Sequence, residues 1–236
     1  MADTEYGQQP HVTPRALTLS KIPGIIEAFE QGAKNALNAG FDGVEIHSAN
    51  GYLLDQFLQD NSNQRTDKYG GSVANRVRLL LEVTQVVVEV WGEGRVGVRL
   101  SPSSAFNDMH DSNPTATFSY VASRLNEFGL AYLHVIEPRI QGNVTIADDS
   151  TGLGARFFRS IFNGSIITAG GYNRESGETV VQSNDADFVA YGRLFLANPD
   201  LPKRFILNAP LNRYDRNTFY SSGAQGYIDY PTLEKI

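Results

Sequence analysis

An imidazole, an amide and a phenol lie close together in the sequence, directly after a short apolar segment. His47, Asn50 and Tyr52 follow residues 44–46, whose alternating side chains predict a strand that ends near His47. On a continuing strand His47 and Asn50 would point in opposite directions, so they converge only if the chain turns, and Gly51 marks a turn. Such a group can polarise a carbonyl and deliver a proton. The alternative interpretation is a buried structural histidine beside a loop asparagine.

The elements that position these residues follow a regular order. Helical segments alternate with short apolar runs, which predicts a parallel α/β sheet in a single domain over residues 1–236. The predicted strands cover residues 42–47, 95–101, 131–137, 165–169 and 187–191. The predicted helices cover residues 22–39, 73–91, 114–128, 153–162, 174–183 and 199–207.

An arginine lies on the inward face of the second predicted strand. The apolar residues of 96–100 would face the helices, which leaves Gly97 and Arg99 facing the interior. A buried arginine needs an anionic partner. That partner is either a bound ligand or an internal carboxylate such as Glu45.

Two glycine-containing turns follow the last two predicted strands. Gly170 and Gly171 end one strand, and Gly192 and Arg193 end the next. Glycine lets a ligand approach the backbone closely, and many barrels hold a phosphate group at this position. These four residues therefore predict a phosphate site, with ordinary turn glycines as the alternative.

Composition excludes several classes of protein. The chain of 236 residues has no cysteine, so disulfides, thiolate metal sites and cysteine nucleophiles are excluded. A net charge of −6 without a basic block argues against a nucleic-acid partner, and no histidines have metal-ligand spacing. No apolar run approaches the roughly 18 residues of a membrane helix, and no secretory signal is evident. We expect a cytoplasmic protein without a metal site or a membrane partner.

Other polar segments predict less chemistry. The loop 107–111 has ligand-like residue types, but we expect it to be solvated. Asn75, Arg76 and Arg78 open a helix and are predicted to tie the loop before it. The polar loop 137–150 is either a cover over the site or disordered.

Several of these segments resemble the Old Yellow Enzyme family of flavin-dependent ene-reductases. The strongest resemblance joins the His47 segment to residues 63–76 (NQRTDKYGGSVANR). Further similar segments are 96–102 (VGVRLSP), 132–139 (YLHVIEPR), 168–172 (TAGGY), 191–201 (YGRLFLANPDL), 219–220 (FY) and 226–231 (GYIDYP). The resemblance covers nearly the whole chain and implies a TIM (β/α)8 barrel.

The resemblance also implies a reaction. NADPH or NADH gives a hydride to the N5 atom of FMN, which passes it to the β-carbon of an activated alkene, an α,β-unsaturated carbonyl or nitro compound. His47 and Asn50 match the pair that bonds the substrate oxygen, and Tyr52 matches the proton donor to the α-carbon. Tyrosine suits that role because a phenol is still protonated at neutral pH.

Cofactor and pocket residues follow from the same resemblance. Arg99 matches the arginine beside N1 and the C2 oxygen of the flavin, where it stabilises the anionic reduced ring. Phe219 and Tyr220 match aromatic residues that line the substrate pocket, although simple packing explains such a pair equally well.

The number of predicted strands departs from the family pattern. A barrel has eight βα units in about 250 residues, whereas five strands are predicted here, and residues 1–17 contain no strand-like run. We therefore expect an N-terminally shortened member that binds FMN poorly alone. A barrel-completing chain or a homo-oligomer would supply the missing cover. Two other hypotheses are a catalytically impaired barrel fragment and a phosphate-binding isomerase or synthase.

Overall fold

A parallel sheet of five strands forms the centre of the computed structural model, which describes residues 2–4, 7–10, 12–141, 144–145 and 152–233. The strands lie in the order β3-β4-β5-β8-β9, and every neighbouring pair is parallel. Their bounds are β3 (Val44–Ser48), β4 (Val96–Leu100), β5 (Tyr132–Ile136), β8 (Ser165–Ala169) and β9 (Phe188–Ala190). All five predicted strands are confirmed within two residues at each end.

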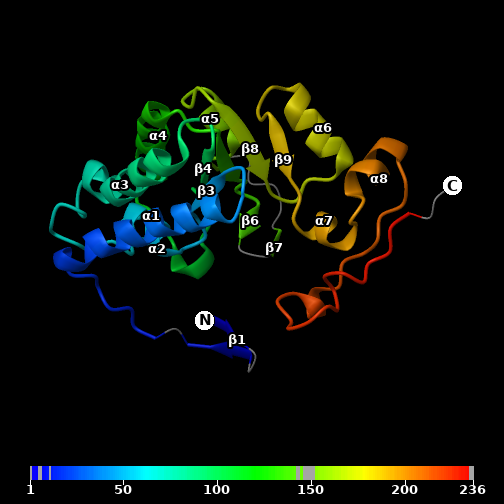
Figure 1. Cartoon of the computed structure of the whole chain (residues 1–236), viewed down its shortest axis with the longest axis horizontal. Helices are drawn as coiled ribbons and strands as arrows, with labels where there is room; N and C mark the ends of the chain where they lie inside the picture. Colours follow the sequence, from blue (N-terminus) through cyan, green and yellow to red (C-terminus); the bar gives the residue numbers. More distant parts are fainter. Residues whose placement is uncertain (1, 5–6, 11, 142–143, 146–151, 234–236) are drawn as a thin grey trace.

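Helices follow the strands and cover one face of the sheet. Figure 1 shows the curved sheet with α3, α4 and α6 along its convex side. The helices are α1 (Ile22–Asn38), α2 (Leu53–Leu58), α3 (Val73–Trp91), α4 (Pro114–Leu125), α5 (Ala155–Arg159), α6 (Arg174–Gln182), α7 (Arg193–Ala197) and α8 (Leu201–Leu207). Among the described residues, no helix is both long and apolar enough to cross a membrane.

The core lies between the sheet and these helices. Ile46, Val98, Leu133 and Ile166 are paired in register on four adjacent strands, and all four are buried. They belong to one apolar cluster with side chains of α3, α4 and α5. Because side chains alternate along a strand, Glu45, Gly97 and Tyr132 must face the opposite side. The inner face is therefore the polar one, as predicted.

Several short elements of the structure were not predicted from the sequence. The 3-10 turns η1 (Leu19–Lys21), η2 (Phe106–Asp108) and η4 (Arg216–Thr218) are a single turn each, and α2 and α7 are also too short for a clear helical period. A further 3-10 turn, η3 (Asn126–Phe128), continues α4 within the predicted helix 114–128. The expectation that residues 1–17 hold none of the missing barrel strands is confirmed for the described residues, since β1 (Ala2–Thr4) and β2 (Gly7–Gln9) pair only with each other, antiparallel and apart from the main sheet. In the loop 137–150, for which a cover over the site was one interpretation, β6 (Ile140–Gln141) pairs with β7 (Val144–Thr145). Residues 142–143 and 146–150 of this loop lie outside the described part of the chain.

Candidate active site at the carboxyl end of the sheet

Three nitrogen-bearing side chains lie in one row across the inner face. His47 on β3 is paired with Arg99 on β4, which is paired with His134 on β5. Residues paired in register on adjacent strands point to the same face of a sheet. His47 and Arg99, predicted from separate motifs, are therefore neighbours near the carboxyl ends of their strands.

Glu45 precedes His47 by two residues on β3, so its carboxylate lies on the same face of the sheet as this row. Its Oε2 accepts a hydrogen bond from His134 Nδ1 at 2.9 Å, and it also bonds the hydroxyl of Tyr132. Burial acts to raise the pKa of Glu45, but the bond and charge of His134 and the charge of Arg99 bring it below the usual value. A Cβ on Gly97 would lie 2.2 Å from the Tyr132 ring, so the glycine leaves room for the tyrosine beside Glu45.

Arg99 carries one of two buried nitrogens in this row that lack a partner among the described residues, and His134 Nε2 is the other. For Arg99 this nitrogen is Nε. Burial lowers the pKa of Arg99, although the charge of Glu45 acts in the opposite sense. The internal ion pair considered for Arg99 is not formed directly, because Glu45 takes His134 as its close partner. A buried donor of this kind suits an acceptor on a bound molecule.

The chain turns directly after β3. Asn50 has φ 57° and Gly51 has φ 73°, two consecutive left-handed residues. A Cβ on Gly51 would lie 2.5 Å from the Cβ of Asn107, so the position also requires glycine for space. Tyr52 follows as the N-cap of α2, and its N–H donates to the Ala49 carbonyl at 3.2 Å. The predicted turn at Gly51 is confirmed.

The structure brings Tyr52 and His47 together. Their ring centroids are 5.2 Å apart with an interplanar angle of 47°. Tyr52 is 55% exposed, so more than half of this residue is open to solvent. The convergence of His47 and Asn50 on one substrate atom stays a prediction, since no described contact measures it.

Distant side chains hold the turn. Asn50 N–H donates to Ser101 Oγ at 2.7 Å, and Asn107 Nδ2 donates to the Asn50 carbonyl at 2.9 Å. The expectation of a solvated loop at 107–111 was wrong at three positions, because Asn107 supports the turn and Met109 and Asp111 are buried. Sequence offered no signal for these contacts, which join residues more than fifty positions apart.

Asp55 is buried below the turn, and no described cation forms an ion pair with it. Its pKa is raised to about 6, because burial outweighs the hydrogen bonds from Gln59, Gly51 and Ser101. This carboxyl group was not singled out from sequence. The available signal was a carboxylate in the first turn of a helix, four residues after Gly51.

We expect Asp55→Asn to alter the pH dependence of stability. The folded pKa of about 6 exceeds the ordinary value of 3.8, so the protonated group stabilises the fold at low pH and this stability is lost as pH rises through about 6. The full difference is about 3 kcal/mol, of which about 2 falls between pH 4 and 7.5. Between pH 4 and 7.5, urea unfolding should show that the free energy of unfolding of the parent falls by about 2 kcal/mol relative to that of Asp55→Asn.

Asp187→Asn is the control for this measurement. Although burial acts to raise it, the pKa of Asp187 is lowered by bonds from Arg159 and the Ile166 N–H, so its contribution is lost as pH falls instead. A pH-independent difference between the parent and Asp55→Asn would contradict the assignment.

The two glycine turns lie at neighbouring strand ends. Thr168 and Ala169 of β8 pair with Val189 and Ala190 of β9, and the turns follow directly. Gly170 and Gly171 have φ 145° and 63°. A Cβ on Gly192 would meet nothing within 4 Å, so its backbone is open to close approach. Arg193 starts α7 with its guanidinium 5.6 Å from the Tyr214 ring centroid.

Arg139 supports this region and was not assigned a role from sequence. Its Nε donates to the Gly170 carbonyl at 2.6 Å, and its guanidinium lies 4.3 Å from the Tyr172 ring centroid. Burial first, and then the charge of Glu137, raise the pKa of Tyr172 to about 12. The Gly170 turn is thus fixed by the loop after β5.

Phe219 and Tyr220 lie on the C-terminal segment. Figure 1 shows this segment on the open side of the curved sheet, away from α3 and α4. Phe219 lies 5.8 Å from the Tyr214 ring, and Tyr220 is 88% exposed. No described contact joins either residue to His47 or Tyr52, so their pocket role stays a prediction.

The motif before α3 is tied as predicted. Asn75 Nδ2 donates to the Gly70 carbonyl at 3.0 Å, and Arg78 Nε donates to the Lys68 carbonyl at 2.8 Å. Arg76 Nη1 donates to the Gly71 carbonyl at 2.8 Å. The loop is therefore held by the first two turns of the helix that it precedes.

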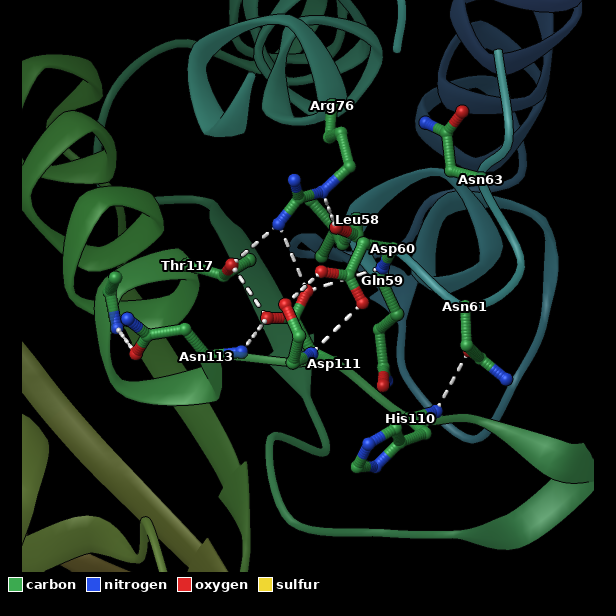
Figure 2. Close-up of polar contacts among 12 residues, drawn as sticks. Leu58, Gln59, Asp60, Asn61, Asn63, Arg76, His110, Asp111, Asn113 and Thr117 are labelled. Carbon is green, nitrogen blue, oxygen red and sulfur yellow. Dashed lines mark hydrogen bonds and ion pairs between the residues drawn. The ribbon is translucent and has the colours of Figure 1, made fainter. Parts of the chain in front are cut away.

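Arg76 also joins three elements in a buried network. Figure 2 shows its guanidinium between Asp111 and Thr117, with bonds of 3.0 and 2.8 Å from Nη2. Its Nε donates to the Leu58 carbonyl at the end of α2, at 2.7 Å. The side chains of Arg76 and Asp111 are 7% and 0% exposed, so the ion pair is shielded from solvent.

Arg76→Met should destabilise the fold by about 3 kcal/mol, because it leaves Asp111 buried without its cation. This loss is at the low end of the range for removing one partner of a buried ion pair, because Asp111 still accepts hydrogen bonds from Thr117, Asn113 and Asp60. Urea unfolding at pH 7 measures the loss. Arg78→Met, at a half-buried position of α3 without a buried ion pair, should cost under about 1 kcal/mol. Equal losses would contradict the role of the network.

Comparison with known proteins places this arrangement among flavin oxidoreductases. Residues 1–212 match the NADH:flavin oxidoreductase / NADH oxidase family. The chain is 55% identical over 228 residues to 12-oxophytodienoate reductase 1 of Oryza sativa subsp. japonica and 51% identical over 222 residues to 12-oxophytodienoate reductase 2 of Arabidopsis thaliana. Each alignment covers 94% of this chain and 59% of the relative, so the chain spans about three fifths of their length.

Solved structures show the same arrangement. Morphinone reductase in complex with tetrahydroNAD superposes with a TM-score of 0.88 at 44% identity, covering 98% of this chain and 62% of that chain. The Old Yellow Enzyme homologue from Zymomonas mobilis superposes with a TM-score of 0.92 at 40% identity, covering 98% and 64%.

Proposed function

Because this chain belongs to the NADH:flavin oxidoreductase / NADH oxidase family, the Old Yellow Enzyme family, we propose that it acts in the FMN-dependent reduction of activated alkenes by NADPH or NADH. Its five parallel strands are part of a TIM (β/α)8 barrel. The substrates are α,β-unsaturated carbonyl or nitro compounds. The observation that carries the proposal is the contact of His47 with Tyr52 at the end of β3, on the strand beside Arg99.

The residues at the carboxyl end of the sheet fit FMN. The buried Nε of Arg99 lacks an acceptor among the described residues, which a flavin carbonyl oxygen or N1 would supply. Gly192 leaves its backbone open, and Arg193 adds charge for a phosphate group. Gly170 and Gly171 would complete the phosphate side. The bound flavin would accept a hydride from the nicotinamide and pass it to the alkene β-carbon.

The side chains after β3 would act on the substrate. Burial and then the charge of Arg99 lower the pKa of His47, so the ring is neutral at pH 7 and donates one N–H. His47 and Asn50 would bond the substrate oxygen and stabilise negative charge as it develops there. Tyr52 would donate its hydroxyl proton to the α-carbon, on an exposed side of the turn.

The other hypotheses explain fewer residues. A phosphate-binding isomerase or synthase would use Gly192 and Arg193 but not His47, Asn50 and Tyr52. Two further hypotheses keep the same site: a fragment that needs a barrel-completing chain, and a homo-oligomer. They differ from the isolated chain in what covers β3, which is an edge strand of the described sheet. Sedimentation of the purified chain separates a homo-oligomer from a monomer.

Two broader proposals accompany the function. One domain over residues 1–236 is supported by a single apolar cluster that runs from α1 to Ala186, and a single calorimetric transition is expected. A cytoplasmic location is supported by the absence of cysteine, because the chain needs no oxidising compartment, and cell fractionation tests it.

The direct test is turnover. Under anaerobic conditions the purified chain, saturated with FMN, should consume more NADPH or NADH than the one equivalent needed to reduce its flavin only when an activated alkene such as 2-cyclohexenone is present. Gas chromatography should show cyclohexanone in equal amount. Nicotinamide oxidation without a reduced product would reject the proposal.

A further inference from the structure

The turn that carries Asn50 is held through its backbone by side chains. All four backbone polar groups of Asn50 and Gly51 bond a side chain from elsewhere. These partners are Ser101 Oγ at 2.7 Å from Asn50 N, Asn107 Nδ2 at 2.9 Å from Asn50 O, Asp55 Oδ2 at 2.8 Å from Gly51 N, and Gln56 Nε2 at 2.7 Å from Gly51 O. The left-handed conformation of Asn50 costs about 1 kcal/mol or more, which such bonds offset.

Asp55 connects two of these bonds. Its Oδ2 accepts from Gly51 N–H at 2.8 Å and from the Ser101 hydroxyl at 3.4 Å. Ser101 in turn accepts from Asn50 N–H, so one carboxylate acts on both residues of the turn. Its Oδ1 accepts from Gln59 Nε2 at 2.9 Å within α2. The carboxylate thus links α2, the end of β4 and the turn.

Burial of a carboxyl group at this position costs free energy unless its oxygens accept hydrogen bonds. Asp55 is 0% exposed, and among the described residues no charged group is a cause of its pKa shift, which comes from burial and hydrogen bonds. Burial raises its pKa, so the position costs stability at neutral pH. A leucine would fill similar volume without that cost but could not accept from Gly51 or Ser101.

We propose that Asp55 is a positioning residue: through Gly51 N–H and the Ser101 hydroxyl it holds the Asn50–Gly51 turn, and thereby Asn50 and Tyr52, at the end of β3. The inference rests on the proposed function for the roles of Asn50 and Tyr52. The position of the turn itself is measurable without flavin.

Three variants separate positioning from general stability. Asp55→Leu removes both acceptors and keeps the volume. Asp55→Asn keeps an oxygen for Gly51 N–H, and the Gln59 amide can rotate to accept from the new amino group. Gln59→Leu removes the bond within α2 and leaves both bonds to the turn, so it is the matched control.

Amide hydrogen exchange of the whole chain, followed by NMR, is the first measurement. Asp55→Leu should speed exchange at Asn50 and Gly51 by about tenfold or more relative to Val98 of β4. Asp55→Asn and Gln59→Leu should stay within about threefold of the parent. Unchanged exchange in Asp55→Leu, or equal loosening by Asp55→Asn and Asp55→Leu, would overturn the proposal.

Ser101→Ala keeps the proposal testable if Asp55→Leu does not fold. It removes only the link to Asn50, so exchange should rise at Asn50 and not at Gly51, whose bond to Asp55 remains. Equal exchange rates in the parent and Ser101→Ala at both amides would count against the link.

The flavin-loaded chain gives the second measurement. Asp55→Leu should lower kcat for alkene reduction about tenfold or more, leave flavin reduction by NADPH unchanged, and be rescued by Asp55→Asn. Full alkene turnover in a folded Asp55→Leu would overturn the positioning role. If the parent reduces no alkene, the proposed function fails, while the exchange rates still decide whether Asp55 holds the turn.

Discussion

Replacing His47 and Asn50 together by alanine should lower the rate of alkene reduction by about 10³-fold or more. Loss of one hydrogen-bond donor to a developing oxyanion costs about 10²- to 10³-fold, and this variant loses both proposed donors. Flavin reduction by NADPH should continue, because neither residue is proposed to act on the nicotinamide beyond lining the site. Stopped-flow absorbance at the flavin band, with NADPH and then with 2-cyclohexenone, resolves the two steps.

The matched control replaces His110 and Asn35, two exposed residues outside the site. His110→Ala with Asn35→Ala should retain both half-reactions within about twofold. Parental alkene reduction by the His47→Ala and Asn50→Ala variant would show that the substrate oxygen is held elsewhere. Loss of bound flavin would instead assign the pair to the cofactor.

Tyr52→Phe should slow alkene reduction by about 10²-fold or more and leave flavin reduction at the parental rate. The change removes only a hydroxyl group, and general acid catalysis by one side chain contributes about 10²- to 10⁴-fold. The ring that lies 5.2 Å from His47 is kept, so packing at the turn is preserved. Product analysis in deuterated water reports protonation at the α-carbon.

Tyr120→Phe is the control for removal of a phenol, because Tyr120 lies on α4 in the outer helix layer, outside the site. It should leave both steps within about threefold. Equal slowing of the two half-reactions by Tyr52→Phe would reassign Tyr52 to packing or to support of the cofactor.

Local sequence was sufficient for the sheet and for part of the site. The strands were predictable because one face of each must be apolar against the helices, as at Ile46 and Val98. The turn at Gly51 was predictable because glycine tolerates φ of 73° and has no Cβ to contact Asn107. The row of His47, Arg99 and His134 needed the strand register in addition.

The features that the sequence did not predict depend on contacts between distant segments. Ser101 and Asn107 meet the turn only after β4 pairs with β3, and nothing near either residue in sequence indicates this. Asp111 lies in a polar run typical of a solvated loop, yet Arg76 from α3 pairs with it in the interior. A short helix such as α2 depends on this packing more than on its own propensity.

Flavin titration tests the central claim, that the carboxyl end of this sheet is a flavin site with a phosphate end and Arg99 at the ring. Dissociation constants of FMN and of riboflavin, which lacks the phosphate, are measured by flavin fluorescence for the chain and for Arg99→Met. We predict saturable binding, FMN at least about tenfold tighter than riboflavin, and both about tenfold weaker in Arg99→Met. No saturable binding, or equal affinities for FMN and riboflavin together with an unaffected Arg99→Met, would contradict the account.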